Sequence, residues 1–292
     1  MTDTGAGGTN RLGQGVEAMQ GEAVDAAGKE RKSRWRFAWW LIFIAGSLYF
    51  FLPLLGTFAF SLKDRPFGSA YTKILADPQF FSTLGYSFVI GIITIIVSIS
   101  IMVPTAFWVR LRMPRARPIV EFITLLPFVI PPIVLVFGLI RTYSQPPLPF
   151  THTSIGSTAL LVCAYVVLSF PYMYRAVDTG LRSMDVQSLT EAAQSLGAGW
   201  IRILVQVILP NLRVAILSGA FLTLAIVVGE FTIALFLARP VFAVYLSRLG
   251  DTAPYQQSAV ALISFGLTWI AMGLIAVIGR GGRGRITVTG NR

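Results

Sequence analysis

The stretch Ile92-Ile-Thr-Ile-Ile-Val-Ser-Ile99 decides the fold class of this chain, because it is strongly apolar and does not alternate between apolar and polar residues. It lies inside a longer uncharged run, Leu84–Val109. An α-helix needs about 20 residues to cross roughly 30 Å of hydrocarbon. Strands of a membrane β-barrel are about ten residues long and alternate in polarity. The stretch therefore predicts a transmembrane helix and an all-α membrane protein.

Five further apolar runs of similar length surround this one. Hydrophobic residues make up 54% of the 292 residues and charged residues 13%, against about 25% charged in a soluble domain. The composition thus predicts a helical bundle with six transmembrane helices, at Phe37–Phe60, Leu84–Val109, Ile119–Ile140, Ile155–Tyr174, Val214–Leu237 and Ala259–Gly279.

The distribution of Lys and Arg predicts the orientation. If the N-terminus is cytoplasmic, the cytoplasmic segments hold 18 of the 24 Lys and Arg residues. Such an excess follows the positive-inside rule, so we expect both termini in the cytoplasm and the chain in the inner or plasma membrane. The net charge of +11 is then mainly an orientation signal, and no nucleic-acid partner is expected.

The chain divides into a membrane domain and two tails. Residues 1–36 are predicted to be a disordered, basic cytoplasmic tail, 37–279 the six-helix domain, and 280–292 a second basic tail. No Walker A phosphate loop occurs, so any ATPase activity is expected in a partner. Neither His152 nor Cys163 has neighbours that predict a metal site. The predicted spans contain no Asp or His, which argues against an intramembrane enzyme.

The longest predicted cytoplasmic connection, Arg175–Arg213, reads as two short helices joined by a turn. The spacing of Ser188 and Glu191 predicts a capping box at the first helix. Gly197 is expected to end that helix in the left-handed conformation, and Pro210 to end the second before the next span. Two apolar faces follow from a helical period, one of Leu189, Ala192, Ala193 and Leu196, the other of Trp200, Ile203, Leu204 and Val207. An amphipathic helix lying on the bilayer is the alternative interpretation.

Within this connection, Glu191-Ala-Ala-Gln-Ser-Leu-Gly197 and Val207-Ile-Leu209-Pro210 resemble the EAA loop of the membrane-spanning subunits of ATP-binding-cassette (ABC) importers. The family pattern is Glu-Ala-Ala, three residues, Gly, nine residues, Ile, one residue, Leu-Pro. The chain departs from it by having Val207 in place of Ile. The matching residues are Glu191, Ala192, Ala193, Gly197, Leu209 and Pro210.

The resemblance implies a type I ABC importer permease and extends over six spans with cytoplasmic ends. In that family two permeases, identical or homologous, form the pathway. Two ATPase subunits, which use ATP and Mg, bind the cytoplasmic face, and an extracytoplasmic solute-binding protein delivers the cargo. The resemblance places the coupling segment at about 183–210 and implies no cofactor bound by this chain. An ATP-independent channel or secondary transporter is the rival interpretation, although no internal repeat typical of secondary transporters is evident.

A proline-rich stretch, Leu126-Pro-Phe-Val-Ile-Pro-Pro-Ile-Val134, is similar to one in permeases for spermidine/putrescine, ferric iron and aminophosphonates, more than to sugar permeases. It favours a polyamine or a similar small charged solute as cargo. Ordinary kinking of a membrane helix by proline is the alternative.

Glu230 is the candidate for substrate chemistry, since a carboxylate within a span usually faces a cavity or the bundle interior. It is expected either to act as counter-ion to a cationic cargo or to hold a structural hydrogen bond at a break near Gly229. Tyr165 and Tyr172 are candidates to line the pathway with their aromatic faces. Glu121 is expected to pair with Arg117 or a neighbouring residue.

Overall fold

The computed structural model describes residues 39–280, and within that range the secondary structure is helical, with no strand. The chain divides into two compact units between Phe60 and Ser61. The first unit contributes most of a helix at Trp39–Ser61. All the elements described below belong to the second unit.

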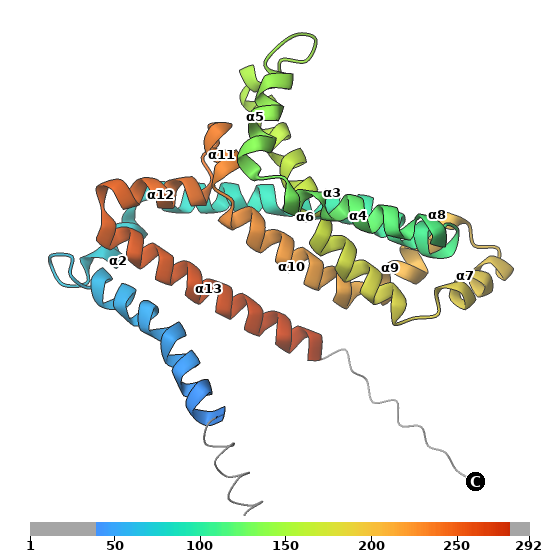
Figure 1. The fold of residues 1–292 in the computed structure, drawn as a ribbon, viewed down its shortest axis with the longest axis horizontal. Helices are drawn as coiled ribbons and strands as arrows, with labels where there is room; N and C mark the ends of the chain where they lie inside the picture. The colour runs from blue at the N-terminus through green and yellow to red at the C-terminus, as the bar shows by residue number, and fades with distance from the viewer. Residues whose placement is uncertain (1–38, 281–292) are drawn as a thin grey trace, which may run out of the picture. The chain divides into compact units, whose positions relative to one another are not determined.

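The second unit contains a series of long helices linked by short ones (Figure 1). Its elements are α2 (Ser69–Ala76), α3 (Pro78–Leu111), η1 (Pro114–Ala116), α4 (Arg117–Val129), α5 (Pro132–Tyr143), η2 (Phe150–His152), α6 (Ser154–Arg182), α7 (Val186–Ser195), α8 (Trp200–Arg202), η3 (Ile203–Ile208, a π-helix), α9 (Leu209–Asn211), α10 (Arg213–Gly229), α11 (Thr232–Phe236), α12 (Phe242–Thr252) and α13 (Pro254–Arg280).

Each of the six predicted apolar runs is largely helical. Among the described residues, three helices are long and apolar enough to cross a membrane unaided, Trp39–Ser61, α3 and α6. Two bent pairs of helices raise the number of candidate spans to five if each pair is one span. Helix α13 covers the predicted sixth span, Ala259–Gly279. The chain is therefore a multi-pass helical membrane protein, and six spans stay a prediction.

The prediction of one continuous third helix is wrong. Helices α4 and α5 meet at an angle of 95° (Figure 1). The break lies at Ile130 and Pro131, whose ψ angles are 115° and 137°. Each of these residues precedes a proline, and a residue before proline is driven out of the helical region. Pro127, by contrast, lies inside α4 without breaking it.

The predicted fifth span is also shorter in the structure. Helix α10 ends at Gly229, Glu230 is extended with ψ 123°, and the five-residue helix α11 follows.

Two amphipathic helices also occupy stretches that the hydropathy pattern leaves as loops. These helices are α2 and α12, and they contribute to one apolar cluster through Ile74, Phe242 and Tyr245.

The fourth helix continues beyond its predicted apolar run. Helix α6 extends to Arg182, eight residues past Tyr174. It therefore contains Asp178, which is only 8% exposed and lies beyond the predicted apolar run Ile155–Tyr174. The carboxylate of Asp178 is tolerated there because two arginines pair with it, as the next section describes.

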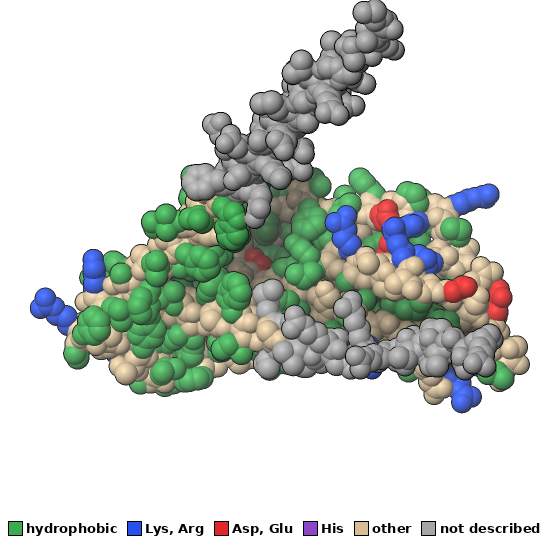
Figure 2. Space-filling model, turned by 90° about the horizontal axis from the view of Figure 1, so that it is seen from below, with side chains coloured by type: hydrophobic (Ala, Val, Ile, Leu, Met, Phe, Trp, Pro, Cys, Tyr) green, Lys and Arg blue, Asp and Glu red, His purple; other side chains and the backbone are tan. Residues whose placement is uncertain are grey.

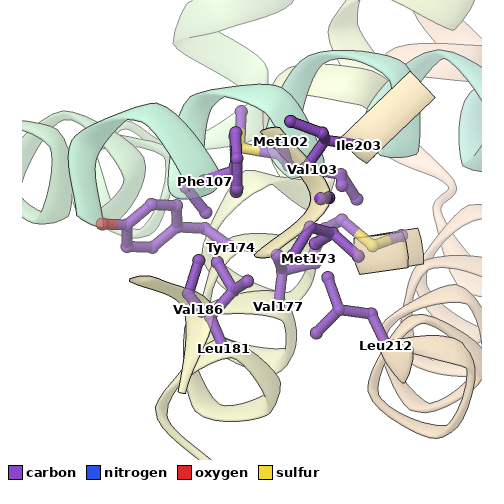
Figure 3. Close-up of a cluster of buried hydrophobic side chains, with 13 residues drawn as sticks. Met102, Val103, Phe107, Met173, Tyr174, Val177, Leu181, Val186, Ile203 and Leu212 are labelled. Atoms are coloured by element: carbon purple, nitrogen blue, oxygen red, sulfur yellow. The ribbon is translucent and has the colours of Figure 1, made fainter. Parts of the chain in front are cut away.

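Helices α3, α6 and α10 form the packed centre. A Cβ at Gly180 of α6 would lie 2.7 Å from side-chain atoms of Ala215 and Leu212, and one at Gly219 of α10 would lie 2.9 Å from Met173 Sδ. Small residues allow such close approach, which is how membrane helices gain packing energy in lipid. Figure 3 shows the adjoining cluster, in which residues of α3 and α6 meet Val186, Ile203 and Leu212. The predicted cytoplasmic connection thus packs onto the ends of the long helices.

Candidate functional site

The N-cap of α7, the first helix of the connection, lies three residues before the predicted cap at Ser188. This residue is Asp185, whose Oδ1 accepts a 3.1 Å hydrogen bond from Ser188 N, while Ser188 Oγ donates to Oδ2 at 2.7 Å. These bonds lower the pKa of Asp185 because they favour the carboxylate. Glu191 Oε1 instead accepts from Gln187 Nε2 at 2.9 Å. The predicted capping box is therefore wrong, and Asp185 is a residue that the spacing argument missed.

The buried face of α7 also differs from the predicted apolar face. Val186, Thr190 and Ala193 are buried, at the i, i+4, i+7 spacing of one helical face. Ala192 is exposed, and Leu196 is 87% exposed. Of the predicted face, Ala193 is buried, Leu189 is half-buried, and Ala192 and Leu196 are exposed, as is the neighbouring Glu191. The EAA residues therefore divide between holding the helix in place and presenting a surface.

Gly197 has the left-handed conformation that the sequence predicts, with φ 79°. Ala198 N donates to Ala193 O at 3.0 Å and Gly197 N donates to Gln194 O at 2.9 Å. These two bonds form a Schellman motif, which satisfies carbonyls at the helix end and fixes the exit direction of the chain. A Cβ at Gly197 would meet no atom within 4 Å, so its backbone conformation is what requires glycine.

The second helical stretch of the connection runs from Trp200 to Asn211. Ile203 is fully buried, and Trp200, Leu204 and Val207 pack against the same cluster, so the second predicted face is confirmed. The stretch bends by 79° into α10. The bend lies at Leu212, two residues after the predicted stop at Pro210.

The two remaining motif residues, Leu209 and Pro210, lie in this second stretch. Leu209 is half-buried against the cluster and Pro210 is exposed. The π-helix Ile203–Ile208 lies directly before them. Since proline provides no N–H and its ring crowds the preceding turn, a local widening of the helix fits its position.

An ion-pair network supports this region from α4 and α6. Arg117 Nη2 donates to Asp178 Oδ2 at 3.1 Å, and Arg182 Nε donates to the same oxygen at 2.8 Å. Arg117 Nε also donates to Glu121 Oε1 at 2.9 Å, so the predicted pairing of Glu121 with Arg117 is confirmed. Figure 2 shows acidic and basic side chains together on the half of the molecule where Figure 1 places α7 and α8.

Exposed apolar side chains lie beside the turn. Ile201 is 81% exposed. It lines a shallow hollow of about 690 Å³ together with Gly199, Trp200, Arg202, Val205 and Gln206. The turn at Gly197 therefore joins two exposed apolar side chains, Leu196 and Ile201, on a segment whose other face is buried. Such a fixed apolar surface is suited to binding another protein.

Glu230 is engaged by its own chain. Its carboxylate accepts hydrogen bonds from Ile233 N at 2.9 Å, from Ala234 N at 3.3 Å and from Tyr165 Oη at 3.1 Å. The side chain thus caps α11, whose first N–H groups have no partner within the helix. Of the two predicted roles for Glu230, the structural hydrogen bond at the break after Gly229 is confirmed.

The two tyrosine candidates lie in different surroundings. Tyr165 is fully buried against Glu230. Tyr172 packs edge-to-face on Phe128, with ring centroids 5.4 Å apart. It lines a groove of about 580 Å³ between α4, α6 and α10, with Arg175, Thr179, Asn211 and Ser218. Among the described lining residues Arg175 is the charged one and none is acidic.

The fold agrees with the comparisons to known proteins. The family model "Binding-protein-dependent transport system inner membrane component" matches residues 102–281, more than half of the chain. The chain belongs to this family. The relatives that it resembles are permease subunits of ABC transporters.

Relatives with different cargoes resemble the chain. A probable molybdenum ABC transporter permease protein of Haloferax volcanii is 27% identical over 245 residues, covering 80% of this chain and 86% of the relative. The molybdenum transport system permease protein ModB of Escherichia coli is 30% identical over 170 residues, covering 54% and 71%. The spermidine/putrescine permease protein PotB of Escherichia coli is 24% identical over 218 residues, covering 67% and 76%.

A solved structure has the same fold. A bacterial ABC transporter involved in import of the acidic polysaccharide alginate matches with a TM-score of 0.64 and 15% identity, covering 84% of this chain and 96% of that chain. At this identity the likeness concerns the fold.

Proposed function

We propose that the chain forms half of the solute pathway of an ATP-driven importer, and that residues 183–210 transmit the movement of a separate ATPase. The observation that carries the proposal is the segment around Gly197. Its inner residues Val186 and Ile203 are buried in the bundle, while Leu196 and Ile201 are exposed on the other side. A short helix pair held in this way is able to transfer a force from a bound partner to the long helices.

The proposed partners follow from family membership. They are two ATPase subunits, a second permease that is a copy or a homologue, and an extracytoplasmic solute-binding protein. ATP and Mg would act in the ATPase subunits. The solved alginate transporter in complex with a pentasaccharide-bound periplasmic protein supports the last of these partners. The proposed orientation has both termini in the cytoplasm, as the distribution of Lys and Arg predicts.

Two small charged cargoes have support. PotB and the proline-rich stretch Leu126–Val134 support the polyamine hypothesis. However, the carboxylate of Glu230, its main candidate counter-ion, accepts three hydrogen bonds from this chain. The molybdenum relatives and the groove whose charged lining residue is Arg175 support an oxyanion. We propose the oxyanion as the leading cargo class.

Co-purification tests the coupling surface. The chain is extracted from its native membrane in mild detergent, and its partners are identified by mass spectrometry. We expect an ABC ATPase subunit and a second permease with the wild type. Leu196→Asp should lose the ATPase subunit and retain the second permease. The matched control is Leu75→Asp, the same change at an exposed residue of α2, which should retain both. An ATPase subunit absent from the wild type, or retained by Leu196→Asp, would contradict the proposal.

Uptake separates the two cargoes. Cells lacking this chain, with and without its gene restored, are given labelled molybdate or labelled spermidine. Restored uptake of molybdate alone supports the oxyanion, and restored uptake of spermidine alone supports the polyamine.

A further inference from the structure

Three side chains link the end of α3 to the beginning of α8. The rings of Trp108 and Trp200 lie 5.0 Å apart between centroids, at an interplanar angle of 41°. The guanidinium carbon of Arg112 lies 5.0 Å from the centroid of Trp200 and 5.9 Å from that of Trp108. Both distances are within the range of a cation–π interaction. We refer to Trp108, Arg112 and Trp200 as the α3–α8 clamp.

Local structure holds the α3 side of the clamp in place. Arg112 is the C-cap of α3, and its backbone N donates to Trp108 O at 2.9 Å. A positive charge is favourable at a helix C-terminus. Within the described part of the chain, Arg112 has no carboxylate partner, so the two aromatic rings are its side-chain contacts. Arginine suits this arrangement because its planar guanidinium stacks on aromatic faces.

The α8 side of the clamp belongs to the connection that carries the EAA residues. Trp200 is the first residue of α8 and directly follows the turn at Gly197 and Gly199. It is half-buried and lines the hollow beside Ile201. A partner that binds at this hollow and shifts α8 therefore acts on Trp200 directly.

Helix α3 extends from the clamp to the other end of the bundle. Its 34 residues form one helix that continues through Pro104, a length of about 50 Å at 1.5 Å per residue. At its far end Asp77 Oδ2 accepts from Tyr245 Oη at 2.7 Å, and Ser87 Oγ accepts from Phe242 N at 2.8 Å. Both partners belong to α12. The clamp and these two bonds therefore connect α8 to α12 through one helix.

We propose that Trp108 and Arg112 are positioning residues that make α3 a direct route for movement from the connection to α12. This inference rests on the proposed coupling function. The buried Val186 and Ile203 reach α3 and α6 by apolar packing, whereas the clamp adds a cation–π contact to α3, the helix that is bonded to α12 at its far end. The interaction is specific to a cation beside two packed indoles, so its loss in an Arg112 variant is separable from a general loss of packing.

A reporter at the far end of α3 tests the clamp. Gln79, an exposed residue of α3, is replaced by Cys in a Cys163→Ala background and labelled with an environment-sensitive fluorophore. The complete complex with its ATPase is placed in lipid nanodiscs and trapped with Mg-ATP and vanadate. We expect a fluorescence change in the parent complex. This change should be lost in Arg112→Leu and in Trp200→Leu, while ATP hydrolysis and melting temperature should persist in Arg112→Leu.

Two further variants keep the test specific. Arg112→Lys retains a cation over the rings and should restore the fluorescence change. Arg115→Leu removes an exposed arginine of η1 that has no contact with either indole, and should leave the change intact. A full change in both Arg112→Leu and Trp200→Leu, or no change in a parent complex that hydrolyses ATP, would overturn the clamp alone. Failure of any ATPase to assemble with the chain would overturn the proposed function instead.

Discussion

The phenol of Tyr165 donates a 3.1 Å hydrogen bond to the carboxylate of Glu230, which joins the interior of α6 to the break that ends α10. Glu230 also accepts from two backbone N–H groups of α11. Two N–H groups in the first turn of α11 are therefore satisfied without water, which helps a helix end to lie within hydrocarbon. Glu230, the sequence's main candidate for cargo binding, thus has a clear structural role.

Substitutions of Glu230 separate the structural role from a counter-ion role. Glu230→Gln keeps a carbonyl acceptor, so we expect uptake near the wild-type rate. Glu230→Ala leaves Ile233 N, Ala234 N and the Tyr165 hydroxyl without this acceptor, and should reduce stability by about 1–3 kcal/mol. Thermal unfolding in detergent and uptake in vesicles measure the two effects. Loss of uptake in Glu230→Gln at unchanged melting temperature would favour the counter-ion role.

Gly197 and Gly199 form a matched pair for testing the turn. Both have free space around them, but only Gly197 has a positive φ. Gly197→Val should therefore strain the turn by about 1–2 kcal/mol and uncouple ATP hydrolysis from transport without unfolding the long helices. Gly199→Ala should behave as wild type, and Gly197→Asn should retain most transport because Asn tolerates this conformation. Normal uptake in Gly197→Val would disprove the role of the turn.

Glu191 offers a second test of the coupling surface. Its carboxylate is exposed and accepts one hydrogen bond, from Gln187 within the same helix. We expect Glu191→Ala to leave the melting temperature unchanged and to lower transport per ATP hydrolysed. Gln187→Ala removes the same intrahelical bond and keeps the carboxylate, so it should not affect coupling. Equal behaviour of the two variants would assign any effect to the bond and remove the partner-binding role of Glu191.

The ion-pair network around Asp178 predicts an asymmetric response. Asp178→Ala leaves two arginines without their shared acceptor. The side chains of Arg117 and Arg182 are 34% and 53% exposed, so we expect a loss of about 1–2 kcal/mol, less than for a fully buried pair. Glu121→Ala removes a carboxylate that is 44% exposed and should cost less. The melting temperatures of the two variants check this order, and a larger loss in Glu121→Ala would contradict it.

The N-cap of α7 should be sensitive to acid. The pKa of Asp185 is lowered in the folded protein by its bonds with Ser188. A lowered pKa means that the stabilisation is complete above the unfolded value, near 3.8, and is lost as the pH falls through the folded pKa. Hydrogen exchange of the peptide that contains α7, corrected for intrinsic rates, should therefore show less protection at pH 3 than at pH 6. Asp185→Asn should keep the cap and lose this pH dependence, and an unchanged dependence would exclude Asp185 as its source.

The sequence predicted which stretches are helical better than it predicted where those helices bend. The length of the apolar runs identified α3 and α6, because helices that cross lipid need long runs of apolar residues. It missed the break at Ile130 and Pro131, since the residues around the break remain apolar. The signal was nevertheless present in Pro131-Pro132, because two consecutive prolines force two residues out of the helical region.

The ends of helices were hardest to predict for a similar reason. Helix α6 continues past Tyr174 because charged residues are accepted in a helix when they pair, as Asp178 does with Arg182 four residues later. Gly197 was predicted correctly, since a positive φ strongly selects glycine. Asp185 was missed because the capping-box rule looks for Glu or Gln three residues after the cap, and Asp185 has Ser188 at that position. The clamp joins residues 92 positions apart, and the periodicity of either segment contains no signal for it.

The close glycine contacts between α6 and α10 have a mechanical consequence. Neither helix has room at Gly180 or Gly219 for even one methyl group without displacing a neighbour, so sliding of one along the other would meet immediate steric resistance. These two helices are then expected to move as a stiff pair. Hinge motion would be confined to the places where the helices already bend or break, at Ile130–Pro131, at Leu212 and at Glu230.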